Sequence, residues 1–290
     1  MKFDKQAKIG YLFFSPALLI FLLFVGYPFL YTVVLSFKDY NWFTKKDVFV
    51  GLSNYVNLFS DVTFWNALLH TLLYTFGTLT GQMLFAFLIA LILNVSFRGI
   101  NVYRSLFILP WILPTVVTSL AWRMMLHERW GVITYLLQVL KITSERAAFL
   151  ASTQTALASV MSVSIWRGYP LIMVGFIAAL QSIPSDIYEA ALIDGASAWR
   201  QLISITLPLL KKMVAIIVLF RTIWVFNDFD LIWLMTRGGP ASATETLPIY
   251  VFQRSFGSYK FGEAATIAMV MFMVLAFFSN IYFKLLKDDN

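Results

Sequence analysis

Cysteine is absent from this 290-residue chain, and charged residues are scarce. The lack of cysteine excludes a disulfide framework, cysteine-ligated zinc and thiol catalysis, although it does not identify the compartment. Charged residues make up 13% of the sequence, against about 25% in an ordinary soluble domain. No polar stretch is long enough to fold as a soluble domain of its own. These absences exclude the common classes of soluble protein.

Hydrophobic residues instead make up 60% of the chain, and apolar runs of about 20 residues or more recur along its length. They predict an all-α integral membrane protein, a single transmembrane domain covering residues 1–290. The first apolar run is too long for a signal peptide and has no small-residue cleavage site, so it is predicted to be an uncleaved membrane helix. About six spans are predicted, at residues 11–37, 65–95, 103–126, 154–182, 206–236 and 262–285.

An even number of spans places both termini on one side of the membrane. Lysine and arginine are concentrated in the shorter segments on the side of the termini, which the positive-inside rule assigns to the cytoplasm. We therefore expect the termini and the loop at residues 183–205 to be cytoplasmic. The net charge of +7 is explained by these loops, which meet anionic lipid, and does not indicate nucleic-acid binding.

The stretch YEAALIDGASAWRQLISITLPLLKK, residues 188–212, is the most polar long run of the chain. Pro184 is predicted to end the fourth span, and Asp186 with Glu189 to form a capping box at the start of a new helix. Gly195, in an Asp-Gly pair, accepts the positive φ that ends a helix. The pattern predicts two short helices joined by a turn, lying on the cytoplasmic face. The first helix presents a patch of small apolar residues beside its glutamate, namely Ile187, Ala190 and Ala191.

Seven positions of this segment carry a fixed pattern: Glu189, Ala190, Ala191, Gly195, Ile205, Leu207 and Pro208. If a random residue matches each fixed position with a probability of about one in fifteen, a chance match to all seven anywhere in the chain has a probability on the order of one in a million. The pattern resembles the EAA signature of permease subunits of ATP-binding-cassette importers. The resemblance implies that residues 184–208 form a coupling segment that docks on a separate cytoplasmic ATPase. The coupling residues would be Glu189, Ala190, Ala191, Asp194 and Gly195.

Two further stretches narrow the resemblance. The chain begins with YLFFSPALLIFLLFVGYPFLYTVVLSFKDYNWF and carries LMTRGGPASATETLPIYVFQRSF after the fifth span. Both resemble carbohydrate importers of the maltose, glycerol-3-phosphate and oligosaccharide type, and residues 238–240 resemble the first of their two permease subunits. The likeness covers essentially the whole chain. It implies a multi-pass protein of a bacterial or archaeal cytoplasmic membrane, working with a second homologous permease, two ATPase subunits and an extracytoplasmic sugar-binding protein.

Ionisable side chains inside apolar runs are costly and usually face a cavity or a partner. Four are found here: Arg167, Arg221, Asp228 and Asp230. The resemblance implies that the stretches around them form the substrate cavity, which alternates in access between the two sides. The candidate carbohydrate contacts are Ser164, Arg167, Gly168, Leu171, Asn227 and Asp228. Flat faces for sugar rings are expected from Trp166, Tyr169 and Trp224.

Arg167 has two possible roles. Members of the resembled family that carry neutral disaccharides tend to have uncharged residues where this chain has Arg167 and Asp228. The arginine either recognises an anionic group such as a uronate or phosphate, or pairs with an aspartate in a buried salt bridge. Other clues are weaker. Trp111 is expected in an interfacial aromatic belt, and His70 and His127 are expected to be structural.

The chain lacks the sequence patterns of an enzyme. It has no GxxxxGK[ST] phosphate loop, no His/Glu metal pattern and no nucleophile elbow, so we expect no catalytic residue, metal or cofactor and assign ATP hydrolysis to partner subunits. The alternative function is a secondary transporter driven by an ion gradient, with Asp228 and Asp230 as proton sites. Against it, the two halves of the sequence do not visibly repeat, and such a transporter has no need of a coupling signature.

Overall fold

The computed structural model describes residues 5–95, 98–143 and 147–287. The chain divides into two compact units. Unit 1 comprises Met1–Trp65 and Tyr250–Val274, and unit 2 comprises Asn66–Ile249 and Leu275–Asn290. Three helices continue from one unit into the other: α4 (Val62–Leu93), α13 (Leu247–Phe252) and α14 (Phe261–Lys287). The single-domain organisation therefore stays a prediction.

Among the described residues, five helical stretches are long and apolar enough to cross a membrane. They are Gly10–Ser36, Val62–Leu93, Ala156–Gln181, Ala198–Phe226 and Phe261–Lys284. A further pair, α5 (Ile100–Ile112) and α6 (Thr115–Met125), makes a sixth if the two count as one broken span. The all-α membrane fold with about six spans is confirmed.

The third predicted span is not one straight helix. Its two parts, α5 and α6, are bent by 90°. The break lies at Leu113, which has an extended backbone (φ −66°, ψ 133°). Proline disfavours the helical conformation of the residue before it, and Pro114 follows directly. The span predicted at residues 103–126 is therefore broken into two helices.

The fifth predicted span, 206–236, is wrong at its C-terminal end, while the short helix predicted to lead into it is present. Its main helix, α11 (Leu207–Phe226), continues without interruption from α10 (Ala198–Gln201) through the π-helical turn η2 (Leu202–Thr206). It ends before Asn227, and a separate short helix, α12 (Asp230–Met235), follows. The amide of Asp228 still bonds to the carbonyl of Val225 at 3.1 Å, so the chain closes a tight turn at the point where the sequence becomes polar.

Unit 1 begins with the first predicted span, in which α1 (Lys5–Phe21), the π-helical turn η1 (Leu22–Gly26) and α2 (Tyr27–Ser36) follow one another. An antiparallel hairpin, β1 (Lys38–Asn41) with β2 (Lys46–Phe49), pairs Lys38 with Phe49 and leads to α3 (Ser53–Phe59). The carbonyl of Ser36 accepts hydrogen bonds from Asn54 Nδ2 at 3.0 Å and Thr266 Oγ1 at 3.1 Å. These bonds join the end of the first span to α3 and α14 within unit 1.

Unit 2 is built on α4, α8 (Ala156–Gln181) and α11. Helices in a bilayer gain little from hydrophobicity and associate through close packing, which small residues allow. A Cβ at Gly77 of α4 would collide with Met161 of α8, and one at Gly81 would collide with Ile165. The two glycines are four residues apart, so they lie on the same helix face. The helices therefore approach one another closely along this face.

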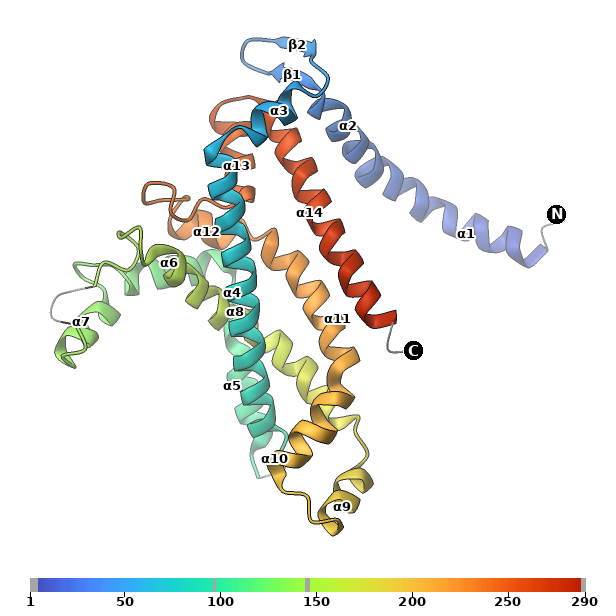
Figure 1. Ribbon diagram of the computed structural model, residues 1–290, viewed down its shortest axis with the longest axis vertical. Helices are drawn as coiled ribbons and strands as arrows, with labels where there is room; N and C mark the ends of the chain where they lie inside the picture. The colour runs from blue at the N-terminus through green and yellow to red at the C-terminus, as the bar shows by residue number, and fades with distance from the viewer. Residues whose placement is uncertain (1–4, 96–97, 144–146, 288–290) are drawn as a thin grey trace. The chain divides into compact units, whose positions relative to one another are not determined.

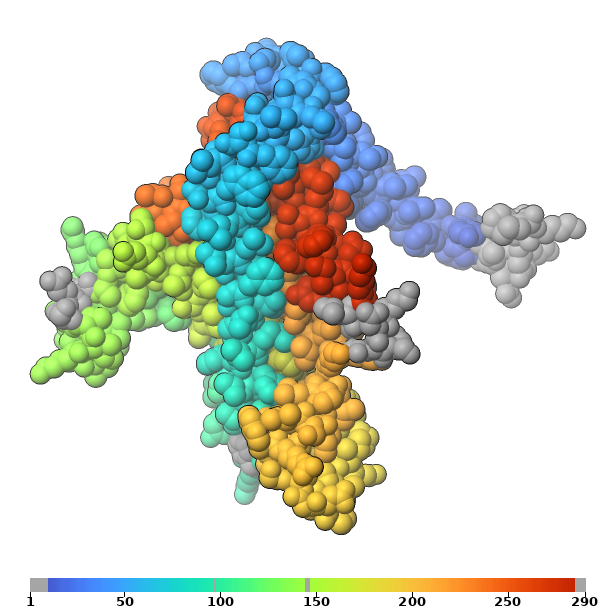
Figure 2. Space-filling view, viewed as in Figure 1, coloured from blue at the N-terminus to red at the C-terminus, as the bar shows by residue number. Residues whose placement is uncertain are grey.

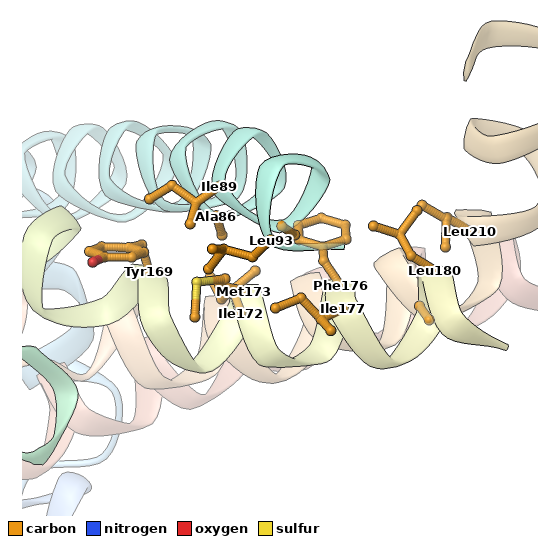
Figure 3. Packing of buried hydrophobic residues seen from close by; sticks show 12 residues of the cluster. Ala86, Ile89, Leu93, Tyr169, Ile172, Met173, Phe176, Ile177, Leu180 and Leu210 are labelled. Atoms are coloured by element: carbon orange, nitrogen blue, oxygen red, sulfur yellow. The ribbon is translucent and has the colours of Figure 1, made fainter. Parts of the chain in front are cut away.

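Further along α4 toward its C-terminus, α4 and α8 share a buried apolar cluster. Figure 3 shows side chains of α4 facing those of α8 across the helix pair. Members include Ala86, Ile89, Leu93, Ile172, Met173, Phe176 and Leu210. A second cluster joins α8, α12 and the residue Tyr74 of α4. Ile133 of α7 (Val132–Val139) packs against the second cluster. At one end of α8 and α11 lie α9 (Ser185–Ile193) and α10 (Figure 1).

Candidate functional site

Unit 2 contains a small polar cavity of about 140 Å³. It is lined by Trp111, Ser164, Arg167, Gly168, Arg221, Trp224, Val225 and Asp228. These residues come from α5, α8 and α11 and from the turn after α11. Positions three and four apart in a helix share a face, which brings Ser164, Arg167 and Gly168 to the cavity together. Four of the six predicted contacts thus line one cavity.

Asp228 is held by a hydrogen bond from α4. The hydroxyl of Tyr74 donates to Asp228 Oδ2 at 2.7 Å, and Tyr74 is fully buried. Asp228 follows α11 in the turn where that helix ends. The tyrosine fixes the orientation of the carboxylate because a charge-assisted hydrogen bond is short and strong.

Arg221 is held by the amide of Gln82. Gln82 Oε1 accepts from Arg221 Nη2 at 2.6 Å and from Nε at 3.2 Å. The other end of the amide donates from Nε2 to the carbonyl of Ser164 at 2.8 Å. A Cβ at Gly168 would collide with both Gln82 Nε2 and Arg221 Nη2. Glycine is therefore the residue that leaves room for this connection between α4, α8 and α11.

Arg167 is not paired with a carboxylate. Its Nη2 donates to Thr115 Oγ1 of α6, and its Nε is buried without a hydrogen-bond partner. Among the residues that the structure describes, it makes no ion pair with an aspartate or glutamate. Buried polar atoms are nearly always hydrogen-bonded, so this nitrogen is an exception. The buried salt bridge considered for Arg167 is therefore not found within the described part of the chain.

Two predicted contacts, Leu171 and Asn227, do not line the cavity. Leu171 lies a further turn along α8 than Arg167. Asn227 is exposed, and its Nδ2 donates to the carbonyl of Ile223 at 2.8 Å. This amide is thus used to close the end of α11. Asp230 is also exposed, at the start of α12.

The aromatic assignments were partly wrong. Tyr169 is a core residue that donates to the carbonyl of Phe107 at 3.1 Å, and Trp166 packs edge-on against Trp122 at 5.3 Å between ring centroids. Of the three rings predicted to face a sugar, Trp224 lines the cavity. Trp111 joins it there, although it had been expected in an interfacial belt.

Two residues of this site, Gln82 and Tyr74, were not predicted from the sequence, and both lie on α4. Gln82 is fully buried within an apolar run, and its polar amide inside a predicted span was the available signal. Tyr74 gave no comparable signal, because tyrosine is common in membrane proteins. Its partner became visible only when α4 and the end of α11 were placed together.

The predicted coupling segment folds as two helices with a glycine turn. The first, α9, ends with the amide of Gly195 bonded to Leu192 O at 3.0 Å and that of Ala196 to Ala191 O at 2.9 Å. Asp194 is the C-cap residue, and Gly195 has φ +75°. This is a Schellman motif, in which the residue after the C-cap is left-handed. The predicted turn is confirmed.

The predicted capping box is wrong. Pro184 is the N-cap of α9, and no side chain caps the helix. Asp186 therefore lies inside the first turn, where its negative charge interacts favourably with the helix dipole. Pro184 has an extended backbone just before the helix, so the helix starts at Ser185, two positions earlier than a capping box of Asp186 and Glu189 requires.

No residue of α9 or α10 is buried. Glu189 is exposed, and the apolar side chains of Leu192, Ile193 and Trp199 are 63%, 87% and 70% exposed. Within unit 2, these two helices form a projecting end of the surface (Figure 2). An internal bond, between the hydroxyls of Tyr188 and Thr206 at 2.9 Å, ties α9 to η2. Exposed apolar groups gathered at one end are typical of a surface that contacts a partner.

Unit 1 carries a polar network before α4. Asp61 Oδ2 accepts from the hydroxyl of Tyr250 at 2.6 Å and from Arg254 Nη2 at 3.3 Å, and Arg254 Nη1 contacts Glu263 at 3.3 Å. Burial tends to raise the pKa of Asp61, but the hydrogen bonds from Tyr250 and Thr63 and the charge of Arg254 outweigh it and lower the pKa. Burial, with the bond to Asp61, raises the pKa of Tyr250 to about 12.

Comparison with known proteins places this geometry in context. The family described as "Binding-protein-dependent transport system inner membrane component" matches residues 82–289. A probable ABC transporter permease of Brucella suis is 34% identical over 281 residues, which cover 97% of each chain. The trehalose/maltose transport system permease protein MalF of Thermococcus litoralis is 32% identical, over 97% of this chain and 94% of its own.

A solved structure also shares the fold. It is the crystal structure of a bacterial ABC transporter involved in the import of the acidic polysaccharide alginate. One of its chains superimposes with a TM-score of 0.82 at 21% sequence identity, over 97% of this chain and 96% of that chain. At this identity the likeness is one of fold.

Proposed function

We propose that this chain, which belongs to the family of binding-protein-dependent transport system inner membrane components, is the permease subunit of an ATP-driven carbohydrate importer. The family match over residues 82–289 carries the proposal. Two features of unit 2 support it. One is a polar cavity lined mainly by two helices with the length and apolarity of membrane spans, and the other is a projecting pair of short helices with no buried residue.

Family membership decides against the ion-gradient alternative. The geometry agrees, because the two aspartates considered as proton sites are not in one place. Asp228 lines the cavity and is bonded to Tyr74. Asp230 is exposed at the start of α12 and is not part of the cavity lining.

The projecting segment is the proposed contact with a cytoplasmic ATPase subunit. Small side chains at Ala190 and Ala191 permit close approach to a groove, and the exposed carboxylate of Glu189 can pair with a basic residue there. Gly195 sets the angle between α9 and α10. The termini would share the cytoplasmic side with this segment. A second permease, a second ATPase and an extracytoplasmic sugar-binding protein would complete the assembly.

The connection from this segment to the cavity is continuous. Helix runs without interruption from Ala198 to Phe226, and at 1.5 Å per residue the distance from Ala198 to Arg221 is about 35 Å. A displacement of α9 and α10 by a closing ATPase dimer would therefore be transmitted along one rigid element to Arg221. Movement of α11 relative to α8 would change the shape and access of the cavity, as alternating access requires.

The cavity chemistry suits a carbohydrate. Sugar hydroxyls need paired donors and acceptors, and the arginines, Asp228 and Ser164 of the lining can supply them. The rings of Trp111 and Trp224 can pack against the apolar faces of sugar rings. The Thermococcus relative belongs by its name to a trehalose/maltose transport system, which supports the same substrate class.

Purification of the tagged chain from native membranes in mild detergent tests this function. Mass spectrometry should identify an ATPase with a phosphate-binding loop and a second permease among the co-purifying chains. A binding protein captured with them should stimulate ATP hydrolysis when it carries its sugar. If the chain is recovered alone or as a homodimer from a preparation that preserves known membrane complexes, the proposal is wrong.

A further inference from the structure

The ionisable side chains of the cavity do not balance in charge. Its lining contains two arginines, Arg167 and Arg221, and one carboxylate, Asp228. Tyr74 reaches Asp228 from outside the lining and carries no charge when it donates its proton in a hydrogen bond. The cavity therefore has an excess of one positive charge. Charges inside a protein interact more strongly than in water, so an anion entering the cavity would be stabilised.

Both arginines keep donors that the protein does not use. Arg167 Nε is buried and has no partner. Arg221 bonds to Gln82 through Nε and Nη2, while its Nη1 has no acceptor among the described residues. A guanidinium offers five N–H donors that match the oxygens of a carboxylate, sulfate or phosphate group. The hydroxyl of a neutral sugar would accept a hydrogen bond from one of these donors, but it would not compensate the positive charge of the arginines.

Gln82 places Arg221 without neutralising it. Its amide oxygen accepts two hydrogen bonds from the guanidinium, and its amide nitrogen is anchored on Ser164 O. A glutamate at position 82 would make similar bonds but would cancel the charge of Arg221. The uncharged amide thus preserves the excess of positive charge, and Gln82 is a positioning residue.

The size of the cavity limits what it can hold. At about 140 Å³, it is smaller than the roughly 300–1,000 Å³ of a typical ligand pocket. It suits one substituent of a larger molecule. Trp111 and Trp224 on the same lining would lie against the adjoining ring.

We propose that Arg167 and Arg221 form a subsite for the acidic group of a sugar, such as the carboxylate of a uronic acid. This inference rests on the proposed import function and narrows its substrate class to acidic carbohydrates. Arg167 and Arg221 contact the acidic group, Gln82 positions Arg221, and Asp228 limits the net charge to one.

The test compares glucuronate with glucose, which differ in the acidic group. The permease complex with its ATPases, in lipid nanodiscs without the binding protein, is titrated with each sugar, and binding is followed by tryptophan fluorescence. Because a well-placed charge pair contributes tenfold or more to affinity, we expect glucuronate to bind at least roughly tenfold more tightly than glucose.

Three variants change the charge of the cavity in known directions. Arg167→Gln and Gln82→Glu should each bring the two affinities close to equality. Asp228→Asn should increase the preference for glucuronate severalfold, a gain that misfolding cannot produce. Arg129→Gln is the matched control, since Arg129 is an exposed arginine outside the cavity, and it should leave the preference unchanged.

Equal affinities for the two sugars, or no binding of either, would overturn the subsite. So would a loss of preference in Asp228→Asn, because the charge of the cavity could not then be its cause. These results are distinct from a failure of the import function, which would appear as absence of the ATPase and second permease from the purified complex. A complex that couples ATP to uptake yet binds both sugars equally contradicts only the subsite.

Discussion

The cavity and the proposed coupling segment of unit 2, residues 184–208, are opposite in construction. In the cavity, Gln82 is fully buried, its amide bonds to two other helices, and Gly168 has no room for one additional carbon. In α9 and α10 no side chain is buried, and nothing lies within 4 Å of a Cβ built on Gly195. The cavity is therefore sensitive to volume and charge within the chain. The proposed coupling segment should be sensitive to what its surface presents to another chain.

The largest effect should come from adding volume to the cavity. Gly168→Ala forces Gln82 and Arg221 to move, and overpacking of this kind costs about 1–3 kcal/mol. We expect uptake to be almost abolished, with a lower melting temperature of the purified complex. Gly10→Ala, where a Cβ meets nothing within 4 Å, is the matched control. Normal uptake by Gly168→Ala would show that the packing of these three helices is not needed for transport.

Charge reversal in the coupling segment should separate stability from function. Glu189→Lys changes an exposed side chain, so the melting temperature should not change. Loss of an ion pair with the ATPase should lower ATP-driven uptake by at least roughly tenfold. Asp186→Asn on the same helix should have a much smaller effect. Unchanged uptake by Glu189→Lys would mean that this carboxylate does not contact the ATPase.

The effect of a substitution at Gly195, in the turn between α9 and α10, should depend only on how readily the new residue adopts a positive φ. A Cβ on Gly195 meets no atom, but its φ of +75° costs an ordinary residue about 1–2 kcal/mol. Gly195→Val should therefore reduce uptake, whereas Gly195→Asn should retain most of it, because asparagine adopts this conformation more readily. Equal uptake by the two variants would indicate that the angle of the turn is unimportant.

The smallest effect concerns Asp61 in unit 1, whose folded-state pKa is lowered. A lowered pKa means that its stabilising contribution is present above the ordinary value of about 3.9 and is lost as the pH falls through the folded pKa. Asp61→Asn should reduce stability at neutral pH by no more than about 1 kcal/mol, because the side chains are partly exposed. The difference from the unaltered protein should shrink below pH 4 when melting temperatures are compared. A constant difference would contradict the assignment.

The two regions also differed in how well the sequence predicted them. The glycine turn could be predicted because a Schellman motif depends on neighbouring residues. The common helix face of Ser164, Arg167 and Gly168 could likewise be predicted, because these residues are three and four positions apart. Gln82 and Tyr74 could not be predicted as partners of Arg221 and Asp228, since the contacts depend on how α4 packs against distant helices.

The errors had local physical causes. The proline at position 114 breaks the third predicted span into two helices, and Trp111, near this break, lines the cavity. The substrate contact at Asn227, which the family resemblance implied, stays a prediction, and the side chain bonds to the last turn of its own helix. Polarity within an apolar run indicates that a side chain has a partner, and packing decides which partner it is.

The most direct test of the central claim is sugar uptake into proteoliposomes that contain the purified complex and its binding protein, with ATP supplied to the ATPase subunits. Uptake should require ATP and should persist when ionophores collapse the proton and sodium gradients. Uptake that continues without ATP and stops when the gradients are collapsed would contradict the importer function and return Asp228 to consideration as a proton site.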